Sequence, residues 1–171
     1  MVTAPLNEDR NAMTTENSLT HLNDKGQAHM VNVADREITV RIALASGWVK
    51  LTPAVVALLR EGGIPKGDVL ATARVAAILG AKRTSDLIPL CHPIAIHGVD
   101  VELEIIDAGV AMSVEVRTVD RTGVEMEALT AVSIAGLTVI DMVKALDPGA
   151  TLCDIRVDRK SGGRNGNWIR D

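Results

Sequence analysis

The sequence predicts an α+β fold in which helices cover one face of an antiparallel sheet. Two apolar segments that alternate with polar residues, 99–106 and 110–116, flank a short turn at 107–109, and this pattern is typical of a β-hairpin. A long apolar segment, 122–149, has the composition of a buried helix. Because helices and strands are mixed along the chain and a hairpin requires antiparallel pairing, the pattern favours α+β.

The composition suits one domain inside the cell. With 171 residues, 47% of them hydrophobic, the chain can bury one core. It contains no run of about 20 consecutive apolar residues that would span a bilayer, and residues 1–18 lack the apolar centre of a secretory signal. The two cysteines, Cys91 and Cys153, match no zinc-ligand spacing. We therefore expect a cytoplasmic protein without membrane contact, with a polar extension at 1–18 and a single domain at 19–171.

Charge and aromatic content argue against nucleic acid as a partner. The formal net charge is −4, so the surface as a whole does not attract polyanions. The chain has no Phe and no Tyr, and it has two tryptophans, Trp48 and Trp168. Because proteins that bind single strands stack bases on aromatic side chains, this class is disfavoured. Local basic clusters can still bind a small anion.

The domain is predicted to begin with a strand and a short helix. Residues 38–44 alternate between aliphatic and other side chains, which is typical of a strand. Residues 51–63 favour a helix in which Thr52 caps the N-terminus, Pro53 occupies the first turn and Gly62 ends the helix.

A second helix and a rigid strip follow. Residues 66–83 are rich in alanine, and Asp68 suits the N-cap position near their start. Residues 83–93 then place three titratable side chains among apolar residues, with prolines that restrict the backbone. The strip is the most unusual segment of the chain.

After the hairpin, the chain is predicted to form one more helix and one more strand. Segment 122–149 is apolar nearly all round and stops at Pro148–Gly149, so we expect it to be covered on more than one side. Residues 151–158 predict a last strand. The glycine-rich residues 160–168 favour a mobile, solvated tail by composition.

Candidate catalytic residues lie on the long helix. Asp141 and Lys144 are three residues apart, so they share a face. Glu127 precedes Asp141 by fourteen residues, about four turns, and points roughly the same way. Taken alone, the pair fits an ordinary surface ion pair better than a catalytic one, although a lysine beside an aspartate can exchange protons.

The rigid strip offers a histidine and a cysteine. His92 precedes a proline, which fixes its direction, and it suits a general acid and a structural role equally well. Cys91 fits a small buried residue better than a nucleophile, because neighbours in an extended segment point to opposite sides. Lys66 can act as a point charge near a helix N-terminus. The residues alone do not identify a reaction.

Three segments resemble the cyclic pyranopterin monophosphate synthase family, the second enzyme of molybdenum cofactor biosynthesis. They are KGDVLATARVAAILGAKRTSDLIPLCHP, TGVEMEALTAVS, and the closing DIR with KSGG. The opening LTHLNDKGQAHMVNV is also similar, so the likeness runs from about residue 19 to residue 168.

The resemblance implies a ferredoxin-like fold and a homohexamer, a trimer of dimers with active sites at subunit interfaces. It implies a lyase that converts (8S)-3',8-cyclo-7,8-dihydroguanosine 5'-triphosphate into cyclic pyranopterin monophosphate and diphosphate. Such a reaction needs proton transfers and charge near the phosphates. No cofactor is implied, and assistance of the triphosphate by Mg²⁺ stays open.

The resemblance also assigns roles to individual residues. Catalytic roles fall on Lys66, His92, Asp141 and Lys144. Substrate-binding positions fall on Leu90, Cys91, His92, Met126, Glu127 and Lys160. We expect Lys66 to reach Asp141 from a neighbouring subunit.

Departures from the family pattern occur at Asn32, Ile140 and Arg164–Asn165, and none of them touches a catalytic position. Two other functions stay open. A non-catalytic nucleotide- or pterin-binding module would not require the two lysines and the aspartate. A cysteine-dependent hydrolase would make Cys91 indispensable.

Overall fold

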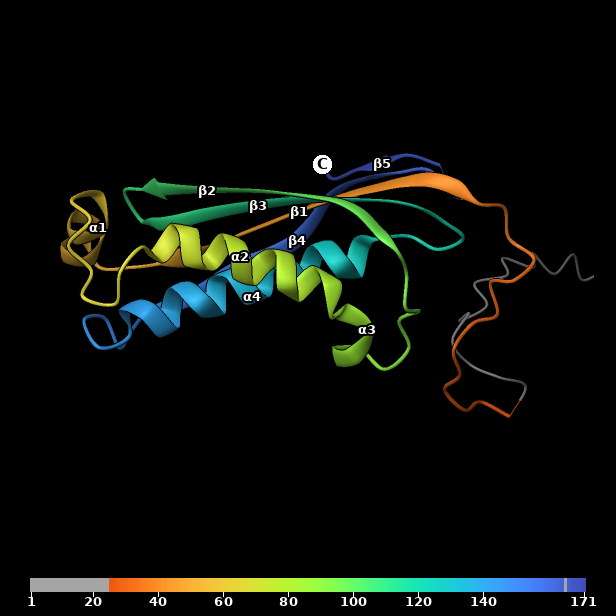
Figure 1. Cartoon of the computed structure of the whole chain (residues 1–171), viewed down its shortest axis with the longest axis horizontal. Coiled ribbons are helices and arrows are strands. Elements are labelled where there is room, and N and C mark those ends of the chain that lie inside the picture. The colour runs from red at the N-terminus through yellow and green to blue at the C-terminus, as the bar shows by residue number, and fades with distance from the viewer. Residues whose placement is uncertain (1–24, 165) are drawn as a thin grey trace, which may run out of the picture. The chain divides into compact units, whose positions relative to one another are not determined.

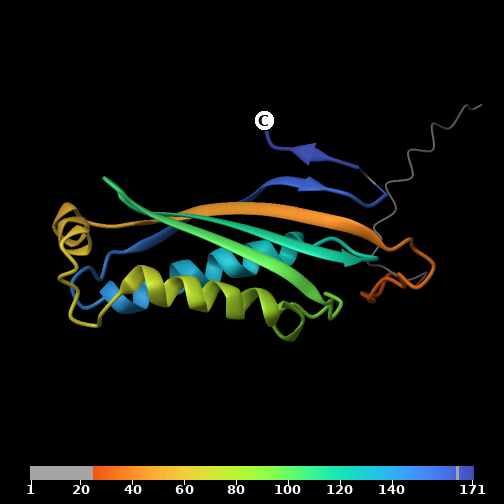
Figure 2. The same ribbon diagram turned by 45° about the horizontal axis from the view of Figure 1, so that its top comes forward.

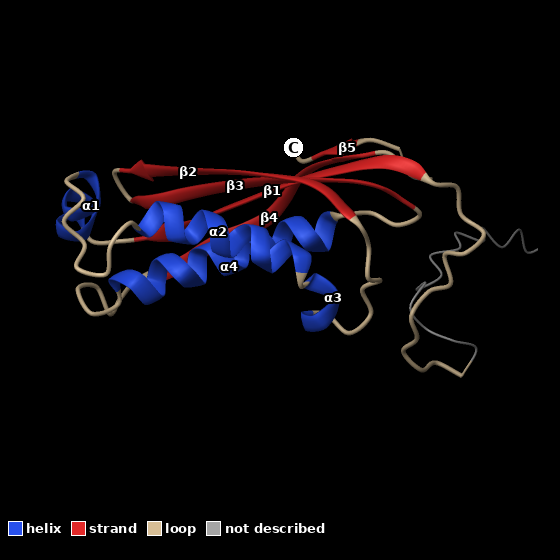
Figure 3. Cartoon of the chain, viewed as in Figure 1, coloured by secondary structure: helices blue, strands red, loops and turns tan. Residues whose placement is uncertain are grey.

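The computed structural model describes residues 25–164 and 166–171, and the chain divides into two units, 1–31 and 32–171. The expected extension at 1–18 lies outside the described residues. In the second unit, a five-stranded sheet has helices on one face (Figures 1 and 3). Its elements are β1 (Thr39–Lys50), α1 (Pro53–Arg60), α2 (Val69–Lys82), α3 (Thr84–Leu87), β2 (Ile96–Ile106), β3 (Gly109–Asp120), α4 (Glu125–Val143), β4 (Thr151–Ser161) and β5 (Trp168–Ile169).

The sheet has the ferredoxin-like topology that the family resemblance implies. Its strand order is β2-β3-β1-β4-β5, and every neighbouring pair is antiparallel. The helices α1 to α3 connect β1 to β2, and α4 connects β3 to β4, so both crossovers lie on the same side of the sheet (Figure 2). The α+β prediction is confirmed, and β5 adds a short edge strand beside β4.

The hairpin of β2 and β3 is confirmed with its turn at 107–108. Val110, Val114 and Val116 are fully buried toward the helices. The other face of the hairpin carries charged side chains such as Glu102 and Glu104, both exposed. One face of the hairpin therefore belongs to the core and the other does not.

The side chains of β1 that face the core are small. Ala43, Ala45 and Val49 are fully buried, whereas Val40 on the opposite face is 60% exposed. Gly47 has a packing reason, because a Cβ atom there would lie 3.1 Å from a methyl group of Val132 on α4. Small side chains in β1 thus let α4 approach the sheet closely.

Helices α2 and α4 lie side by side on this face (Figure 1). A Cβ atom at Gly80 of α2 would lie 2.8 Å from the Cγ1 atom of Ile134 on α4, so the two helices are in close contact. By composition and length α4 could cross a membrane, but more than half of its most apolar stretch is buried inside the protein. It is a core helix, as the all-round apolar pattern predicts.

Three local predictions need correction. The strip at 83–93 begins with the helical turn α3, in which the Ile88 N–H donates to the Thr84 carbonyl at 2.9 Å. Strand β4 continues to Ser161, three residues past the predicted end. Residues 160–168 are not a solvated tail throughout, because the chain returns and Trp168 pairs with Lys160 in β5.

Candidate active site

Lys66, Asp141 and Lys144 meet at the C-terminal end of α4; we call them the lysine cluster. The Lys66 Nζ lies 3.2 Å from Asp141 Oδ2 and donates to the Asp141 carbonyl at 2.7 Å. The Lys144 Nζ lies 2.7 Å from Asp141 Oδ1. One carboxylate therefore sits between two ammonium groups, each about half exposed or more.

The KGD sequence explains how Lys66 reaches α4. Gly67 has a φ of +97°, a conformation that favours glycine, and its N–H donates to the Ile64 carbonyl at 3.0 Å. Asp68 then caps α2, accepting from the Ala71 N–H at 2.9 Å as predicted. The three residues of the motif thus contribute a charge, a turn and a helix cap in that order.

Asp147 joins the end of α4 to the start of α1. Its side chain is almost fully buried, and it accepts from the Thr52 N–H at 2.7 Å and the Gly149 N–H at 3.1 Å. Thr52 takes the predicted N-cap position of α1, but its hydroxyl makes no capping bond. Asp147 therefore ties the turn that follows Lys144 to the helix that leads to Lys66.

The carboxylate of Asp141 stays ionised near neutral pH. The hydrogen bonds from Lys144 and then from Lys66 hold the pKa of Asp141 below its usual value. The expectation that Lys66 comes from a neighbouring subunit is wrong, because Lys66 contacts Asp141 of its own chain. The three side chains therefore contact one another within one chain.

A second group of titratable residues lies at the other end of α4; we call Cys91, Glu125, Glu127 and Lys160 the glutamate cluster. Glu127 is only 4% exposed, and burial, reinforced by the charge of Glu125, raises its pKa to about 7. The Lys160 Nζ lies 2.8 Å from Glu125 Oε1. Glu127 can therefore gain or lose a proton near neutral pH.

The thiol of Cys91 belongs to this cluster through its charge environment. Burial first, and the nearby carboxylate of Glu127 second, raise the pKa of Cys91. A raised pKa keeps the thiol protonated, which disfavours a thiolate nucleophile. Leu90, Cys91 and His92 are half-buried, and Met126 at the start of α4 is 38% exposed.

The two clusters cannot meet within one chain. Glu127 and Asp141 are fourteen residues apart on one continuous helix, which corresponds to about 21 Å along its axis. The two ends of α4 lie at opposite ends of the helical layer (Figure 1). The structure thus brings together Lys66, Asp141 and Lys144, but it leaves Glu127 and Cys91 at a distance.

Sequence reasoning missed two features of these clusters. It treated Glu127 as a binding residue, although burial gives it a pKa suited to proton transfer. It did not single out Glu125, which pairs with Lys160. The signal for both is the acid–apolar–acid spacing at the start of a helix that carries no further charge until Asp141.

Among the described residues, no three His, Cys, Asp or Glu side chains gather as ligands for a metal ion. Ile140 packs against the core from α4. Asn32 accepts from the Ala34 N–H at 2.9 Å, while Asn165 lies outside the described residues.

Comparison with known proteins shows which family the chain resembles. A model of the MoaC family matches residues 30–163. The chain is 58% identical over 161 residues to the cyclic pyranopterin monophosphate synthase of Streptomyces griseus, covering 94% of this chain and 91% of that protein. It is 54% identical over 169 residues to that of Streptomyces avermitilis, covering 99% of both.

A mycobacterial relative is similarly close. The chain is 56% identical over 152 residues to cyclic pyranopterin monophosphate synthase 2 of Mycobacterium tuberculosis, covering 89% of this chain and 91% of that protein. All three alignments extend over most of both chains, and the family match at residues 30–163 includes the segments that carry the lysine and glutamate clusters.

Proposed function

The chain belongs to the MoaC family and has the cyclic pyranopterin monophosphate synthase activity of molybdenum cofactor biosynthesis, and we propose that its two clusters are halves of one active site completed between subunits. The substrate is (8S)-3',8-cyclo-7,8-dihydroguanosine 5'-triphosphate. The products are cyclic pyranopterin monophosphate and diphosphate.

The lysine cluster supplies positive charge at the phosphates. The cyclic phosphate forms when a hydroxyl oxygen attacks the α-phosphorus and diphosphate leaves, so negative charge grows on the leaving oxygens. Two ammonium groups held by Asp141 are placed to stabilise this charge. Either lysine can also deliver a proton, because Asp141 keeps the group in place without itself titrating near neutral pH.

The glutamate cluster supplies a group that exchanges protons. Opening the purine-derived ring and closing it as a pterin requires protons to leave some atoms and arrive at others. A buried carboxyl with a pKa of about 7 can serve as acid and base near neutral pH. His92 follows Cys91 in the chain and gives the same half-site a second group for binding or proton transfer.

An exposed apolar strip between the clusters supports their completion by a second chain. Val75 and Leu79 of α2 are 67% and 50% exposed, and Leu137 of α4 is 55% exposed. Aliphatic side chains in a patch between two half-sites favour contact with another protein surface. An antiparallel, two-fold pairing of helical layers would place the lysine cluster of one chain against the glutamate cluster of its partner.

The single observation that carries the proposal is the separation of about 21 Å between the two ends of α4. Either half alone lacks part of the chemistry: the buried carboxyl whose pKa is raised to about 7 lies in the glutamate cluster, and that cluster pairs its lysine with Glu125. We further propose that the pairs assemble into a cytoplasmic homohexamer, a trimer of dimers.

Subunit mixing tests the shared site. We expect the Lys66→Ala protein and the His92→Ala protein to be inactive alone, because each substitution inactivates one half of every active site. In mixed pairs, one site carries both changes and the other carries none. An equimolar mixture after subunit exchange should therefore recover about a quarter of wild-type turnover, as random two-fold pairing dictates.

The matched control mixes Lys66→Ala with Asp141→Ala. Both changes lie in the same half-site, so each site of a mixed pair keeps one defect and turnover should not recover. Equal recovery in both mixtures, or in neither after verified exchange, would contradict the assignment of the two half-sites.

A non-catalytic binding module of the same fold is the alternative function. It would bind the cyclised nucleotide without forming diphosphate. The three-membered contact of Lys66, Asp141 and Lys144 favours catalysis, because binding a phosphate does not need a carboxylate between the lysines. Incubating the purified protein with the substrate and measuring diphosphate and pterin product separates the two functions.

A further inference from the structure

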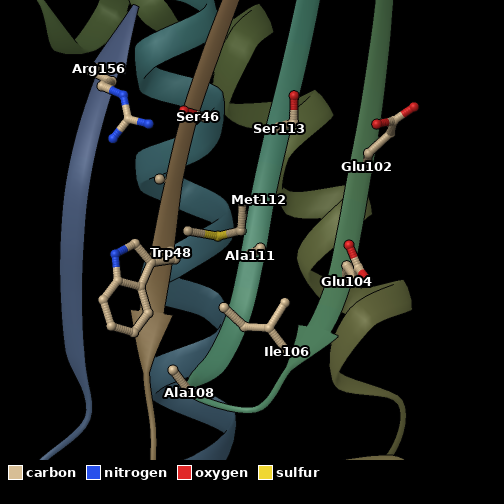
Figure 4. A pocket seen from close by; sticks show the side chains of 11 residues that line it. Ser46, Trp48, Glu102, Glu104, Ile106, Ala108, Ala111, Met112, Ser113 and Arg156 are labelled. Atoms are coloured by element: carbon tan, nitrogen blue, oxygen red, sulfur yellow. The ribbon is translucent and has the colours of Figure 1, made fainter. Parts of the chain in front are cut away.

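Two consecutive backbone N–H groups hold the start of α1. The Leu51 N–H donates to the Ala108 carbonyl at 3.0 Å, and Ala108 lies in the turn that joins β2 to β3 (Figure 4). The Thr52 N–H donates to Asp147 Oδ2 at 2.7 Å. The first bond is made with the sheet and the second with the turn that follows α4. The position of α1 therefore depends on Asp147 as well as on the sheet.

The surroundings of Asp147 suit this contact. The side chain is buried, and each carboxylate oxygen accepts a backbone hydrogen bond, Oδ2 from Thr52 and Oδ1 from the Gly149 N–H at 3.1 Å. Its own N–H donates to the Val143 carbonyl at 2.9 Å. Because a buried carboxylate is costly unless its oxygens accept hydrogen bonds, these contacts hold the side chain in one place.

Helix α1 is linked to Lys66 through the core. Val55 and Leu59 of α1 belong to the same buried cluster as Ile64 in the loop that follows. The Ile64 carbonyl accepts from the Gly67 N–H at 3.0 Å and closes the turn that contains Lys66. A Cβ atom at Gly67 would meet nothing within 4 Å, so packing at Gly67 does not hold this turn. The place of the Lys66 ammonium group therefore follows the place of α1.

We propose that Asp147 is a positioning residue of the active site: it fixes the start of α1 and thereby places the Lys66 ammonium group on Asp141. This inference rests on the proposed catalytic role of Lys66. The Lys66 Nζ lies 2.7 Å from the Asp141 carbonyl oxygen and 3.2 Å from Asp141 Oδ2. A displacement of about 1 Å would break at least one of these bonds, and displacements of that size can cost about a hundredfold in rate.

A second side-chain contact of α1 is much weaker. At the other end of the helix, the Arg60 Nη2 lies 2.7 Å from Asp107 Oδ1, and the Asp107 side chain is 97% exposed. Exposed ion pairs contribute little to stability. Asp107→Asn is therefore a control that removes a charged contact of α1 without moving the helix.

Thr52→Pro tests the proposal by removing the donor while Asp147 stays in place. Thr52 has a φ of −69° and a ψ of 149°, which proline adopts, and proline has no N–H. We expect turnover to fall by about tenfold to a hundredfold. Thr52→Ala is the matched control: it keeps the N–H and loses a hydroxyl that makes no capping bond, so turnover should stay within about twofold.

The chemical reactivity of Lys66 gives a readout that does not depend on turnover. Acetic anhydride labels lysines, and mass spectrometry gives the rate at Lys66 relative to the exposed Lys82. In Thr52→Pro and in Asp147→Ala this rate should rise by about threefold to tenfold, the effect of losing one or two hydrogen bonds. In Asp107→Asn it should not change.

A double variant separates positioning from a general loss of folded protein. Adding Thr52→Pro to Lys66→Ala should leave the residual turnover unchanged, because a residue that acts through Lys66 then has nothing to position. A loss of folded protein would lower turnover by the same factor in both backgrounds, and that result overturns the proposal. Circular dichroism verifies that each variant is folded.

The outcomes distinguish this inference from the proposed function. An unchanged labelling rate of Lys66 in Thr52→Pro, or an equal loss of turnover in Thr52→Ala, overturns the positioning role of Asp147. Faster labelling with unchanged turnover supports the placement of Lys66 by Asp147 and overturns the catalytic role of Lys66 instead. Asp147→Ala leaves two N–H groups unpaired, so Thr52→Pro decides between these outcomes if Asp147→Ala does not fold.

Discussion

The two ends of α4 carry their carboxylates in opposite environments. At the C-terminal end, the Asp141 side chain is 59% exposed, and two lysines lower its pKa. At the N-terminal end, Glu127 is 4% exposed, and burial raises its pKa to about 7. One end therefore holds a constant charge near neutral pH, while the other exchanges a proton. Burial and neighbouring charges, not residue type, determine which carboxylate keeps its charge and which exchanges a proton.

The largest expected effect comes from breaking the constant-charge end. Lys66→Ala, Asp141→Ala and Lys144→Ala should each lower turnover about a hundredfold or more, the usual scale for losing a positioned acid or base. Because the three groups contact one another, a double variant such as Lys66→Ala with Asp141→Ala should lose much less than the product of the single losses. Steady-state turnover measures both points.

The contact geometry of the lysine cluster is tested by the same series. All three side chains are largely exposed, so the variants should keep their melting temperature. A single variant with wild-type turnover would remove that residue from the catalytic group, and fully multiplicative losses would show that the residues act separately.

A smaller effect is expected at the proton-exchanging end. Glu127→Gln keeps the shape of the side chain but cannot exchange a proton, so turnover should fall about tenfold to a hundredfold. The wild-type profile of turnover against pH should show an inflection near pH 7, as the pKa of about 7 requires, and the variant should lack it. An inflection that persists in Glu127→Gln would assign it to another group, such as His92.

The same variant has a consequence for stability. Folding raises the pKa of Glu127 from 4.5 to about 7, so the folded state binds this proton more tightly than the unfolded state. The resulting stabilisation is complete below about pH 4.5 and is lost as the pH rises through about 7. Denaturation between pH 5 and pH 8, a range of about three units around that pKa, should show a steeper loss in wild type than in Glu127→Gln.

The smallest effect is expected at Cys91. Because burial and Glu127 keep the thiol protonated, Cys91→Ala should retain turnover within about threefold, a packing effect and not a chemical one. His92→Ala is the contrasting neighbour and should lose substrate binding or turnover. If Cys91→Ala were folded and inactive, the thiol would be a nucleophile after all, and the acid–base assignment at this end would be wrong.

The sequence predicts those parts of the fold that depend on local patterns. The hairpin, the buried helix and the Asp68 cap follow from alternation, composition and a single polar side chain. The short helix α3 and the strand β5 do not, because one turn of helix and two strand residues leave no period to detect. In β1 both faces carry apolar residues, so alternation predicts a strand without telling which face is covered.

In the site too, the sequence predicts the features that depend on neighbouring residues and misses those that depend on residues distant in the chain. The spacing of Asp141 and Lys144 predicts their contact, because three residues return to one helix face. The sequence does not show whether Lys66 reaches Asp141 of its own chain or of another. That contact depends on the turn at Gly67 and on the hydrogen bond that Asp147 accepts from the Thr52 N–H. The pKa of Glu127 depends on burial by residues distant in the chain, which no local motif reports.

The uninterrupted length of α4 has one more consequence if the proposed shared site holds: it sets the spacing between the two half-sites that each chain carries. If two copies lie antiparallel, the distance from Glu127 to Asp141 must equal the offset that joins each half-site to its complement, and the symmetry applies the same length twice. Removing one helical turn would shorten this spacing by about 5.4 Å in each chain, and both active sites of the pair would then be misaligned. Under that proposal, insertions or deletions within the nineteen residues of α4 should be far less tolerated than substitutions of its buried side chains.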